Sequence, residues 1–332
     1  MKIHDYIAKS RNNEPFSREE LIRMLSFPPE SAENYQIMAE AQRISRELTY
    51  GQAEIHAQFA LNLSPCPQNC KFCSFARING VFDTEVQIEI EEAVRQVRQF
   101  EKDKPGAIFV MTTANYDFGK FLEISQEMRK NIDPATILVA NIGDKNKDEA
   151  RKIKEAGYQG VYHAVRLREG KDTSIDPALR LRSINAFQEA GLGVGMCVEP
   201  IGPEHTNEEI AEMILLTDRL NPVFSGAMRR IPIPGSSLST FGMISELRMA
   251  QIVAVTRLGT SRTVKGNCTH EPCTLGALAG ANLFWAEVGA NPRDTREKTE
   301  QGRGRTIEQC KTIFREANWK VSEDESIFFG PY

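Results

Sequence analysis

Three cysteines lie within eight positions of one short stretch, SPCPQNCKFCSF, which spans residues 64–75. Thiols at this density can form disulfides, bind zinc or hold an iron–sulfur cluster, and each use predicts a different class of protein. The three residues are Cys66, Cys70 and Cys73, and the other cysteines of the chain are Cys197, Cys268, Cys273 and Cys310. Seven is an odd number, which disfavours a complete disulfide framework.

The spacing C-x3-C-x2-C favours iron–sulfur chemistry over zinc. A closed structural zinc site takes four ligands, commonly as paired C-x2-C units, whereas only three thiols lie together here. A 4Fe-4S cluster is held by cysteine thiolates on its irons. Three protein ligands leave one iron open for a small molecule. We therefore predict that Cys66, Cys70 and Cys73 hold a 4Fe-4S cluster and that the ring of Phe72 lies beside it.

The bulk composition predicts a globular protein with a sizeable core. Hydrophobic residues make up 41% of the chain, which is enough for such a core. A net charge of −4 and a pI near 5.9 argue against a nucleic-acid partner bound through broad positive potential. No stretch approaches 18 consecutive apolar residues, so no membrane span is expected. Residues 1–16 lack an apolar signal core, and we expect a cytoplasmic protein with reduced thiols.

Apolar runs and helical segments alternate along most of the chain. The runs are at 54–63, 107–111, 137–141, 160–164, 193–199, 222–228, 262–265 and 282–287. Capping-box patterns at 17–20, 84–87 and 206–209 mark helix starts. Eight strands alternating with helices pair in parallel and close most simply as a (β/α)8 barrel.

This pattern predicts an α/β fold with three parts. Residues 1–52 form N-terminal helices, 53–288 form a TIM-type barrel, and 289–332 form a C-terminal cap over one barrel end. Six of the eight strands are followed by polar, glycine-rich or thiol-rich loops. Because barrel chemistry is built on the loops after the carboxyl ends of strands, these loops are expected to form the site.

The segment CPQNCKFCSF after the first strand resembles the signature of radical S-adenosylmethionine (SAM) enzymes, and the likeness covers roughly residues 50–320. It is closest to the biotin synthase-like branch, which includes enzymes similar to the hydrogenase maturase and to methylornithine synthase. The resemblance implies that SAM binds the open iron and that reduction by a ferredoxin or flavodoxin releases a 5′-deoxyadenosyl radical. That radical abstracts hydrogen from an unactivated carbon, while the barrel excludes solvent and positions the substrate.

The resemblance also implies residues that contact SAM. Thr112 and Thr113 occupy the segment that meets the methionine amino group, although threonines there can equally form a turn. Arg166 and Glu169 stand where the family places ribose and carboxylate contacts, but similar enzymes often have Asn and Asp in this segment. Arg180, on the following helix, is a candidate for the methionine carboxylate, with a solvent-exposed arginine as the alternative.

Two further segments carry contacts that the resemblance implies. Ile201, after strand five, and Ile233, after strand six, are expected to pack against adenine from opposite sides. Arg229 and Arg230 precede Ile233, and a guanidinium is matched to a substrate carboxylate. Either arginine could instead pair with an acidic neighbour. His270 falls near the position of an arginine that binds the second cluster of biotin synthase.

The remaining cysteines suggest an auxiliary iron–sulfur cluster. Cys268 and Cys273 flank the turn between strand seven and its helix, and Cys310 lies on the expected cap helix. If that helix covers the barrel mouth, these three thiols share a cluster. The alternative is that they are unrelated packing residues. Cys197 is interpreted equally as a core residue or a ligand.

An auxiliary cluster would supply sulfide to a substrate radical. We therefore expect sulfur insertion into an acyl chain or carboxylate, with the resemblance favouring two-subunit lipoyl synthases slightly over biotin synthase. The substrate would be a small molecule or an acyl chain on a carrier, with a second radical SAM subunit as a candidate partner. The alternatives are a mutase or lyase without sulfur transfer, and a non-catalytic zinc or electron-transfer protein.

Overall fold

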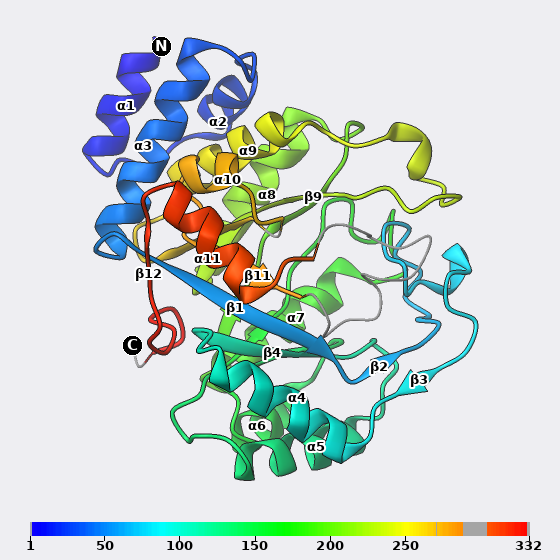
Figure 1. Cartoon of the computed structure of the whole chain (residues 1–332). Helices are drawn as coiled ribbons and strands as arrows, with labels where there is room; N and C mark the ends of the chain where they lie inside the picture. Colours follow the sequence, from blue (N-terminus) through cyan, green and yellow to red (C-terminus); the bar gives the residue numbers. More distant parts are fainter. Residues whose placement is uncertain (1, 270, 288–303, 331–332) are drawn as a thin grey trace.

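Parallel strands close into a ring with helices around it, as the sequence predicted (Figure 1). The computed structural model describes residues 2–269, 271–287 and 304–330. The ring strands are β1 (Gln52–Ala60), β4 (Ala107–Met111), β5 (Leu138–Asn141), β6 (Gly160–Tyr162), β7 (Gly193–Gly195) with β8 (Val198–Ile201), β9 (Phe224–Arg229), β10 (Gly266–Thr269) and β11 (Leu283–Ala286). The fifth strand position is split between β7 and β8, which both pair with β9, and β10 closes the ring between β9 and β11.

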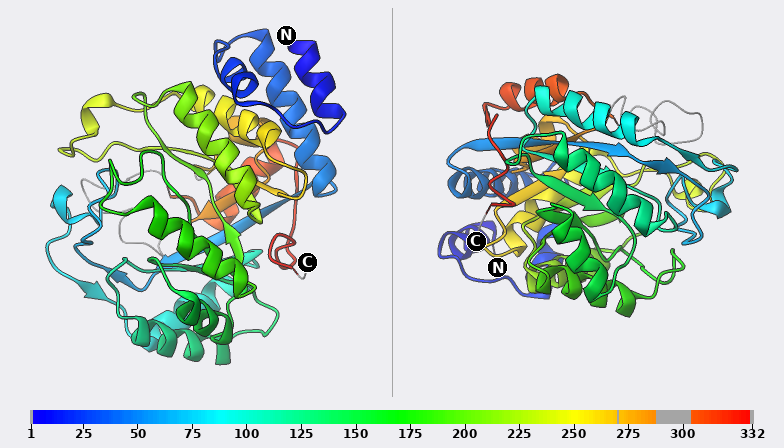
Figure 2. Two further views of the ribbon diagram at one scale, coloured as in Figure 1. Left: turned by 180° about the vertical axis from the view of Figure 1, so that it is seen from behind. Right: turned by 90° about the horizontal axis from the view of Figure 1, so that it is seen from below.

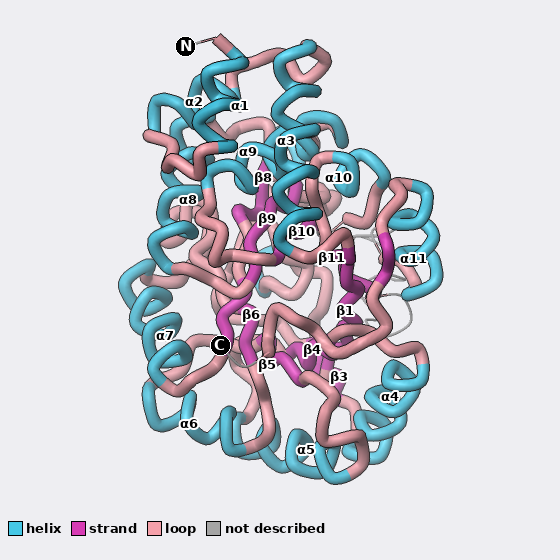
Figure 3. Tube along the Cα trace, turned by 90° about the vertical axis from the view of Figure 1, so that its left-hand side faces the viewer, coloured by secondary structure: helices cyan, strands magenta, loops and turns pink. Residues whose placement is uncertain are grey.

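Helices follow the strands and form the outer layer (Figure 3). They are α4 (Ile90–Lys102), α5 (Phe118–Lys130), α6 (Lys147–Glu155), α7 (Pro177–Glu189), α8 (Asn207–Leu220), α9 (Glu246–Gly259), α10 (Thr274–Leu278) and α11 (Ile307–Glu316). The capping box predicted at Thr206 forms, since its side chain accepts a hydrogen bond from the Glu209 N–H. The predicted α/β class and TIM-type (β/α)8 barrel are therefore confirmed.

Side-chain alternation along the strands separates the barrel interior from the helix layer. On β11, Leu283 and Trp285 face the interior cluster, whereas Phe284 and Ala286 pack in the outer cluster. Successive residues of a strand point to opposite faces, and parallel barrel strands are covered on both faces. A shift of one residue in strand position would therefore move a side chain from the interior to the helix layer.

Three helices precede the barrel and pack on its outside. They are α1 (Ile3–Arg11), α2 (Arg18–Leu25) and α3 (Ala32–Leu48). The predicted capping box at Ser17 forms, with Ser17 accepting from the Glu20 N–H. Leu21, Ile37 and Ile44 enter the same buried cluster as the apolar face of α9, so these helices dock on the outer layer (Figure 2).

The amino-terminal end of the barrel is closed by aromatic side chains. His56 and Phe109 stack with ring centroids 5.4 Å apart, and Phe328 and Phe329 from the C-terminal segment complete the cluster. Gly160 leaves room for this plug, because a Cβ there would lie 2.2 Å from Cε1 of Phe329. The cavity for chemistry must therefore open at the opposite, carboxyl end of the strands.

Two local predictions are wrong. Residues 262–265 are not a strand; the seventh strand is β10, at Gly266–Thr269, which pairs with β9. Nor does Thr84 cap a helix: Val86–Gln87 forms β3, which pairs with β2 (Asn62–Leu63), and α4 begins at Ile90 after Glu89. Local capping patterns compete with strand pairing, and here the tertiary pairing prevails.

The described part of the C-terminal segment does not cover the barrel mouth. Helix α11 lies on the outer face of β1 and β11, where Phe314 stacks on Phe284 with centroids 3.9 Å apart. Strand β12 (Lys320–Val321) then pairs with the start of β1. What this segment does close is the amino-terminal end, through Phe328 and Phe329, so α11 serves as an outer helix of the barrel.

Candidate active site

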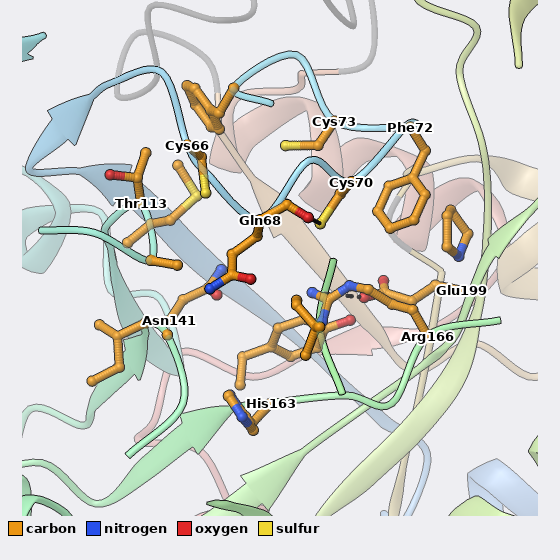
Figure 4. Close-up of a pocket in the computed structure, with 18 of the residues that line it drawn as sticks. Cys66, Gln68, Cys70, Phe72, Cys73, Thr113, Asn141, His163, Arg166 and Glu199 are labelled. Atoms are coloured by element: carbon orange, nitrogen blue, oxygen red, sulfur yellow. Dashed lines mark hydrogen bonds and ion pairs between the residues drawn. The ribbon is translucent and has the colours of Figure 1, made fainter. Parts of the chain in front are cut away.

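The loop of the three cysteines leaves β1 and is fastened to its own turns and to the segment after β6. The Cys66 N–H donates to the Phe75 carbonyl at 2.7 Å, and the Cys73 N–H donates to the Cys70 carbonyl at 2.9 Å. The Lys71 ammonium lies 3.0 Å from Oδ1 of Asp172. These bonds hold all three thiols at the wall of one open cavity of about 210 Å³ at the carboxyl end of the strands (Figure 4).

Cys66, Cys70 and Cys73 all line the cavity, as expected for ligands of one cluster. Among the described residues, no group of three or more His, Cys, Asp or Glu side chains is arranged to hold a single metal ion. Burial, reinforced by Cys73, raises the pKa of the Cys70 thiol well above its usual range. Its thiolate therefore needs a cation, which cluster irons supply.

An ion pair lies across the cavity from the thiols. Nη2 of Arg166 is 3.3 Å from Oε1 of Glu199, and both side chains line the cavity. Burial would lower the pKa of the Arg166 guanidinium, but the charges of Glu199 and Glu169 outweigh burial and raise it. Arg166 is thus a permanent, partly buried cation at the base of the site (Figure 4).

A second buried cation, Arg180 of α7, is held by acidic groups. It lies 3.2 Å from Oδ1 of Asp144 and 3.6 Å from Oε2 of Glu169. His163 joins it, with Nε2 2.8 Å from Nη1 of Arg180 and 2.9 Å from Asp144. Burial, and then the Arg180 charge, lowers the pKa of His163 to about 4, so the ring is neutral at pH 7. The alternative of a solvent-exposed Arg180 does not hold, since this side chain is buried.

The structure brings several other expected contact residues to the cavity wall. Phe72, Thr112 and Thr113 line it. The backbone N–H of Thr113 donates to Oδ1 of Asn62 at 2.9 Å, and the Thr113 hydroxyl accepts from Nδ2 of Asn62 at 2.8 Å. Glu169 sits behind the wall, where it accepts from the backbone N–H of Arg166 at 3.0 Å.

Ile201 does not contact the cavity. Its side chain is buried in the outer cluster with Ile210 and Ala211, because the split of the fifth strand turns this position outward. Ile233 packs against Cys66 and Met111 beside the cysteine loop, while Ile231 lines the cavity instead. The expected adenine contact at Ile201 is therefore corrected, and Ile231 and Pro200 take its place on the wall.

The expected substrate arginines line the cavity but are already paired. Arg229 pairs with Glu271 and donates to the Ile244 carbonyl at 3.1 Å. Arg230 pairs with Glu204 and is buried. The acidic-neighbour alternative thus holds for both. His270 lies outside the described residues.

Cys268, Cys273 and Cys310 do not come together. Cys268 is on β10 itself and faces the barrel interior. Cys273 is the N-cap of α10, where its sulfur accepts from the Gly276 N–H at 3.3 Å. Cys310 is buried on the outer side of β11, 3.6 Å from the Trp285 carbonyl oxygen. A barrel strand separates Cys310 from Cys268, so the expected three-thiol cluster has no support in this arrangement.

Cys268 has Cys197 as its neighbour instead. Both thiols are buried in the interior cluster, and β7, β8 and β10 all flank β9, with Cys268 opposite Gly226. A Cβ at Gly226 would lie 2.1 Å from the Cys268 carbonyl oxygen, so only glycine fits between these strands. Burial, and then a hydrogen bond with Cys197, raises the pKa of Cys268 well above its usual range.

Sequence reasoning missed the inward-facing residues at the strand ends. These residues also line the cavity: Gln58 on β1, Met111 on β4, Asn141 on β5, Tyr162 on β6 and Met228 on β9. A period-two count along each predicted strand could have found them, because each is the last or nearly the last interior position of its strand.

Comparisons with known proteins point to one superfamily. The family model of the Radical SAM superfamily matches residues 65–217. Biotin synthase from Ehrlichia canis is 24% identical over 258 residues, covering 70% of this chain and 77% of that protein. Biotin synthase from Corynebacterium urealyticum is 21% identical over 264 residues, covering 76% of each.

Solved structures show the same fold at low identity. The crystal structure of HydG, a maturase of the FeFe-hydrogenase, has a TM-score of 0.80 at 17% identity and covers 98% of this chain and 77% of that chain. Methylornithine synthase (PylB) has a TM-score of 0.79 at 14% identity and covers 96% of this chain and 97% of that chain.

Residues 65–217, which include the three-cysteine loop, match the Radical SAM superfamily. This match and the biotin synthase relatives support the assignment of a radical SAM enzyme. Within that superfamily it is similar to biotin synthases. This assignment implies a 4Fe-4S cluster and SAM. The predicted cluster ligands, Cys66, Cys70 and Cys73, all line the cavity. Among the described residues, no helix has both the length and the apolar character needed to cross a membrane.

Proposed function

We propose that the chain abstracts hydrogen from a small polar substrate enclosed in the barrel cavity. The observation that carries this proposal is the cavity itself, with three cluster-spaced thiols on one wall and the Arg166–Glu199 pair opposite. Cys66, Cys70 and Cys73 would hold a 4Fe-4S cluster, which together with SAM and a reductant would supply the radical for this abstraction.

The charges of the cavity suit the zwitterionic, sulfonium-bearing cofactor. Two arginines, Arg166 and Arg180, stand against three carboxylates, Asp144, Glu169 and Glu199, which leaves one negative charge in excess. SAM carries a net positive charge and includes a carboxylate. We assign the methionine carboxylate of SAM to Arg166 and Arg180, and its amino and sulfonium groups to the three carboxylates. We assign Thr112 to the part of SAM next to the cysteine loop.

We favour a reaction on the carbon skeleton, as in a mutase or lyase, over sulfur transfer. Sulfur insertion needs a second sulfide source, and the cysteines expected to supply it lie in three separate places. The HydG and PylB structures share the fold only and so do not decide between reactions.

Sulfur insertion is the second candidate, and one specific observation favours it. Cys197 and Cys268 are adjacent inside the barrel, and the curated relatives are biotin synthases. Under this candidate, sulfur would be inserted into an acyl chain or carboxylate. The candidate includes lipoyl formation on a carrier-bound chain with a second radical SAM subunit.

Anaerobic reconstitution separates the two candidates. A single cluster gives about four irons per chain, whereas an auxiliary cluster raises the count to about six to eight. The reduced protein, with dithionite or a ferredoxin or flavodoxin as reductant, should convert SAM to 5′-deoxyadenosine. Absence of 5′-deoxyadenosine from protein that carries its full iron content would contradict the enzyme proposal. Cys70→Ala should abolish both iron binding and cleavage, with Cys310→Ala as the matched control.

A further inference from the structure

The base of the cavity carries polar side chains that neither the cluster nor the SAM contacts use. We propose that Asn141 and Tyr162 form a substrate subsite for an uncharged group that presents a hydrogen-bond donor beside an acceptor, such as a carboxamide. Glu287 and Gln58 set the direction of its hydrogen bonds. The proposal deepens the proposed function, on which it rests, by naming the class of group that the enzyme recognises.

The two subsite residues are neighbours on adjacent strands. The pairing of β5 with β6 places Val139 opposite Gly160 and Ala140 opposite Val161, so Asn141 is opposite Tyr162 one position further. Adjacent strands lie about 4.8 Å apart, and both side chains line the cavity. One small functional group can therefore contact both residues.

A chain of hydrogen bonds fixes which atom of Asn141 faces the substrate. Nε2 of Gln58 donates to Oε1 of Glu287, and Nδ2 of Asn141 donates to Oε1 of Gln58 at 3.0 Å. Because the amide nitrogen of Gln58 donates to Glu287, its oxygen is turned toward Asn141. One N–H of Asn141 is then held by Gln58, and Oδ1 is the acceptor that Asn141 offers to a ligand.

Tyr162 supplies the complementary donor. Its side chain is 7% exposed, and its hydroxyl has no hydrogen-bond partner within the described part of the chain. Burial, and then the neighbouring Cys197 and Glu199, raises the pKa of the phenol well above its usual range, so the O–H stays protonated. A buried hydroxyl without a partner is destabilising, and a ligand carbonyl that accepts from it would remove that cost.

The surrounding charges exclude a charged group from this position. Arg166 is paired with Glu199 at 3.3 Å, and Glu287 already accepts from Gln58. A carboxylate has no hydrogen to donate to the Asn141 oxygen, and an ammonium cannot accept a hydrogen bond from the Tyr162 O–H. A carboxamide satisfies both, since its N–H donates to Asn141 and its carbonyl accepts from Tyr162.

Ligand binding to the reconstituted holoenzyme with SAM tests the subsite. The probes are butyramide, butyrate, butylammonium and 2-pentanone, which have similar size and differ in the group presented. Ligand-observed NMR should show butyramide binding at least about 5-fold tighter than the other three. Tyr162→Phe and Asn141→Leu should each remove this preference, while Tyr158→Phe, which alters a phenol in the outer layer bonded to Ser125, should retain it.

Glu287→Gln tests the direction of the chain. A glutamine can donate as well as accept, so the side-chain amides of Gln58 and Asn141 are free to reverse their hydrogen bonds. The affinity for 2-pentanone should then rise relative to the affinity for butyramide. Equal binding of all four probes by the wild-type protein would overturn the proposal, and would mean that water rather than a ligand satisfies the Tyr162 hydroxyl. The experiment does not depend on SAM cleavage: 5′-deoxyadenosine without amide preference overturns the subsite alone, and amide preference without cleavage overturns only the proposed reaction.

A second readout uses the radical itself. Perdeuterated butyramide held in the subsite should pass deuterium to 5′-deoxyadenosine, which gains one mass unit, and perdeuterated butyrate should not. Deuterium transfer that is equal for the two compounds, or unchanged in Tyr162→Phe, would contradict recognition by this subsite.

Discussion

Nη2 of Arg166 lies 3.3 Å from Oε1 of Glu199 at the base of the cavity, across from the three cysteine thiols. Arg166 comes from the loop after β6 and Glu199 from β8, so the pair joins two neighbouring strand ends. It sets the electrostatic character of the site, because the partly buried guanidinium neutralises a buried carboxylate that would be unfavourable alone.

Breaking this pair should destabilise the protein. Arg166→Gln leaves the Glu199 carboxylate buried without its cation, and removing one partner of a buried pair costs about 3–5 kcal/mol. The double variant Arg166→Gln with Glu199→Gln should lose less than the sum of the single variants. Urea denaturation measures both.

Arg182→Gln is the control for that experiment. Its side chain is 66% exposed and lies 3.8 Å from Asp176, and such exposed pairs contribute about 0–1 kcal/mol. A loss at Arg166 no greater than at Arg182 would show that the buried pair is not important for stability.

The separated cysteines give a prediction on iron content. Cys310→Ala and Cys273→Ala should each leave the iron count and SAM cleavage at the wild-type level, because neither thiol lies at the cavity wall. Cys66→Ala should lose most of its iron. Iron and sulfide analysis after anaerobic reconstitution measures this. A lower iron content in Cys310→Ala would contradict the prediction and support an auxiliary cluster at Cys310.

His163 predicts acid sensitivity in a defined window. Its pKa in the folded protein is about 4, against 6.5 for the free side chain. The unfolded state therefore binds a proton that the folded state refuses, and stability is lost as pH falls from about 6.5 to about 4, by up to about 3 kcal/mol.

His163→Asn should flatten the dependence of the unfolding free energy on pH in that window. Asp144, whose pKa is lowered although burial opposes this, contributes stability that is lost only at lower pH, below its ordinary value near 3.8. Unfolding free energies measured at pH 7, 5.5 and 4.5 check the prediction. An unchanged slope in His163→Asn would contradict it.

The aromatic plug at the amino-terminal end predicts a packing effect. In Gly160→Ala the new Cβ would overlap Phe329, and overpacking of this kind costs about 1–3 kcal/mol. Phe329→Leu in the same chain should recover part of that loss. Thermal unfolding of the three variants measures it, and full additivity of the two substitutions would show that Phe329 is not the residue displaced.

Sequence alone determined the features that depend on short-range spacing. The C-x3-C-x2-C loop has its three predicted ligands within eight residues, so any fold that places the loop at a cavity wall brings the same three thiols to the cavity. The order of apolar runs and helices likewise determined the barrel, since parallel strands with crossover helices have few ways to close.

Only the tertiary structure decided where isolated residues lie. The seventh strand, β10, begins at Gly266, four positions later than the expected start at 262, and this shift puts Cys268 on an inward-facing strand position rather than on a loop. The side-chain period of two makes such positions sensitive to a single residue, which is also why Ile201 faces the helix layer. Cys310 lies outside the barrel because α11 packs its apolar face on β1 and β11. The Glu287–Gln58–Asn141 chain joins three strands through hydrogen bonds that no local pattern encodes, so the subsite could be found only once the barrel had closed.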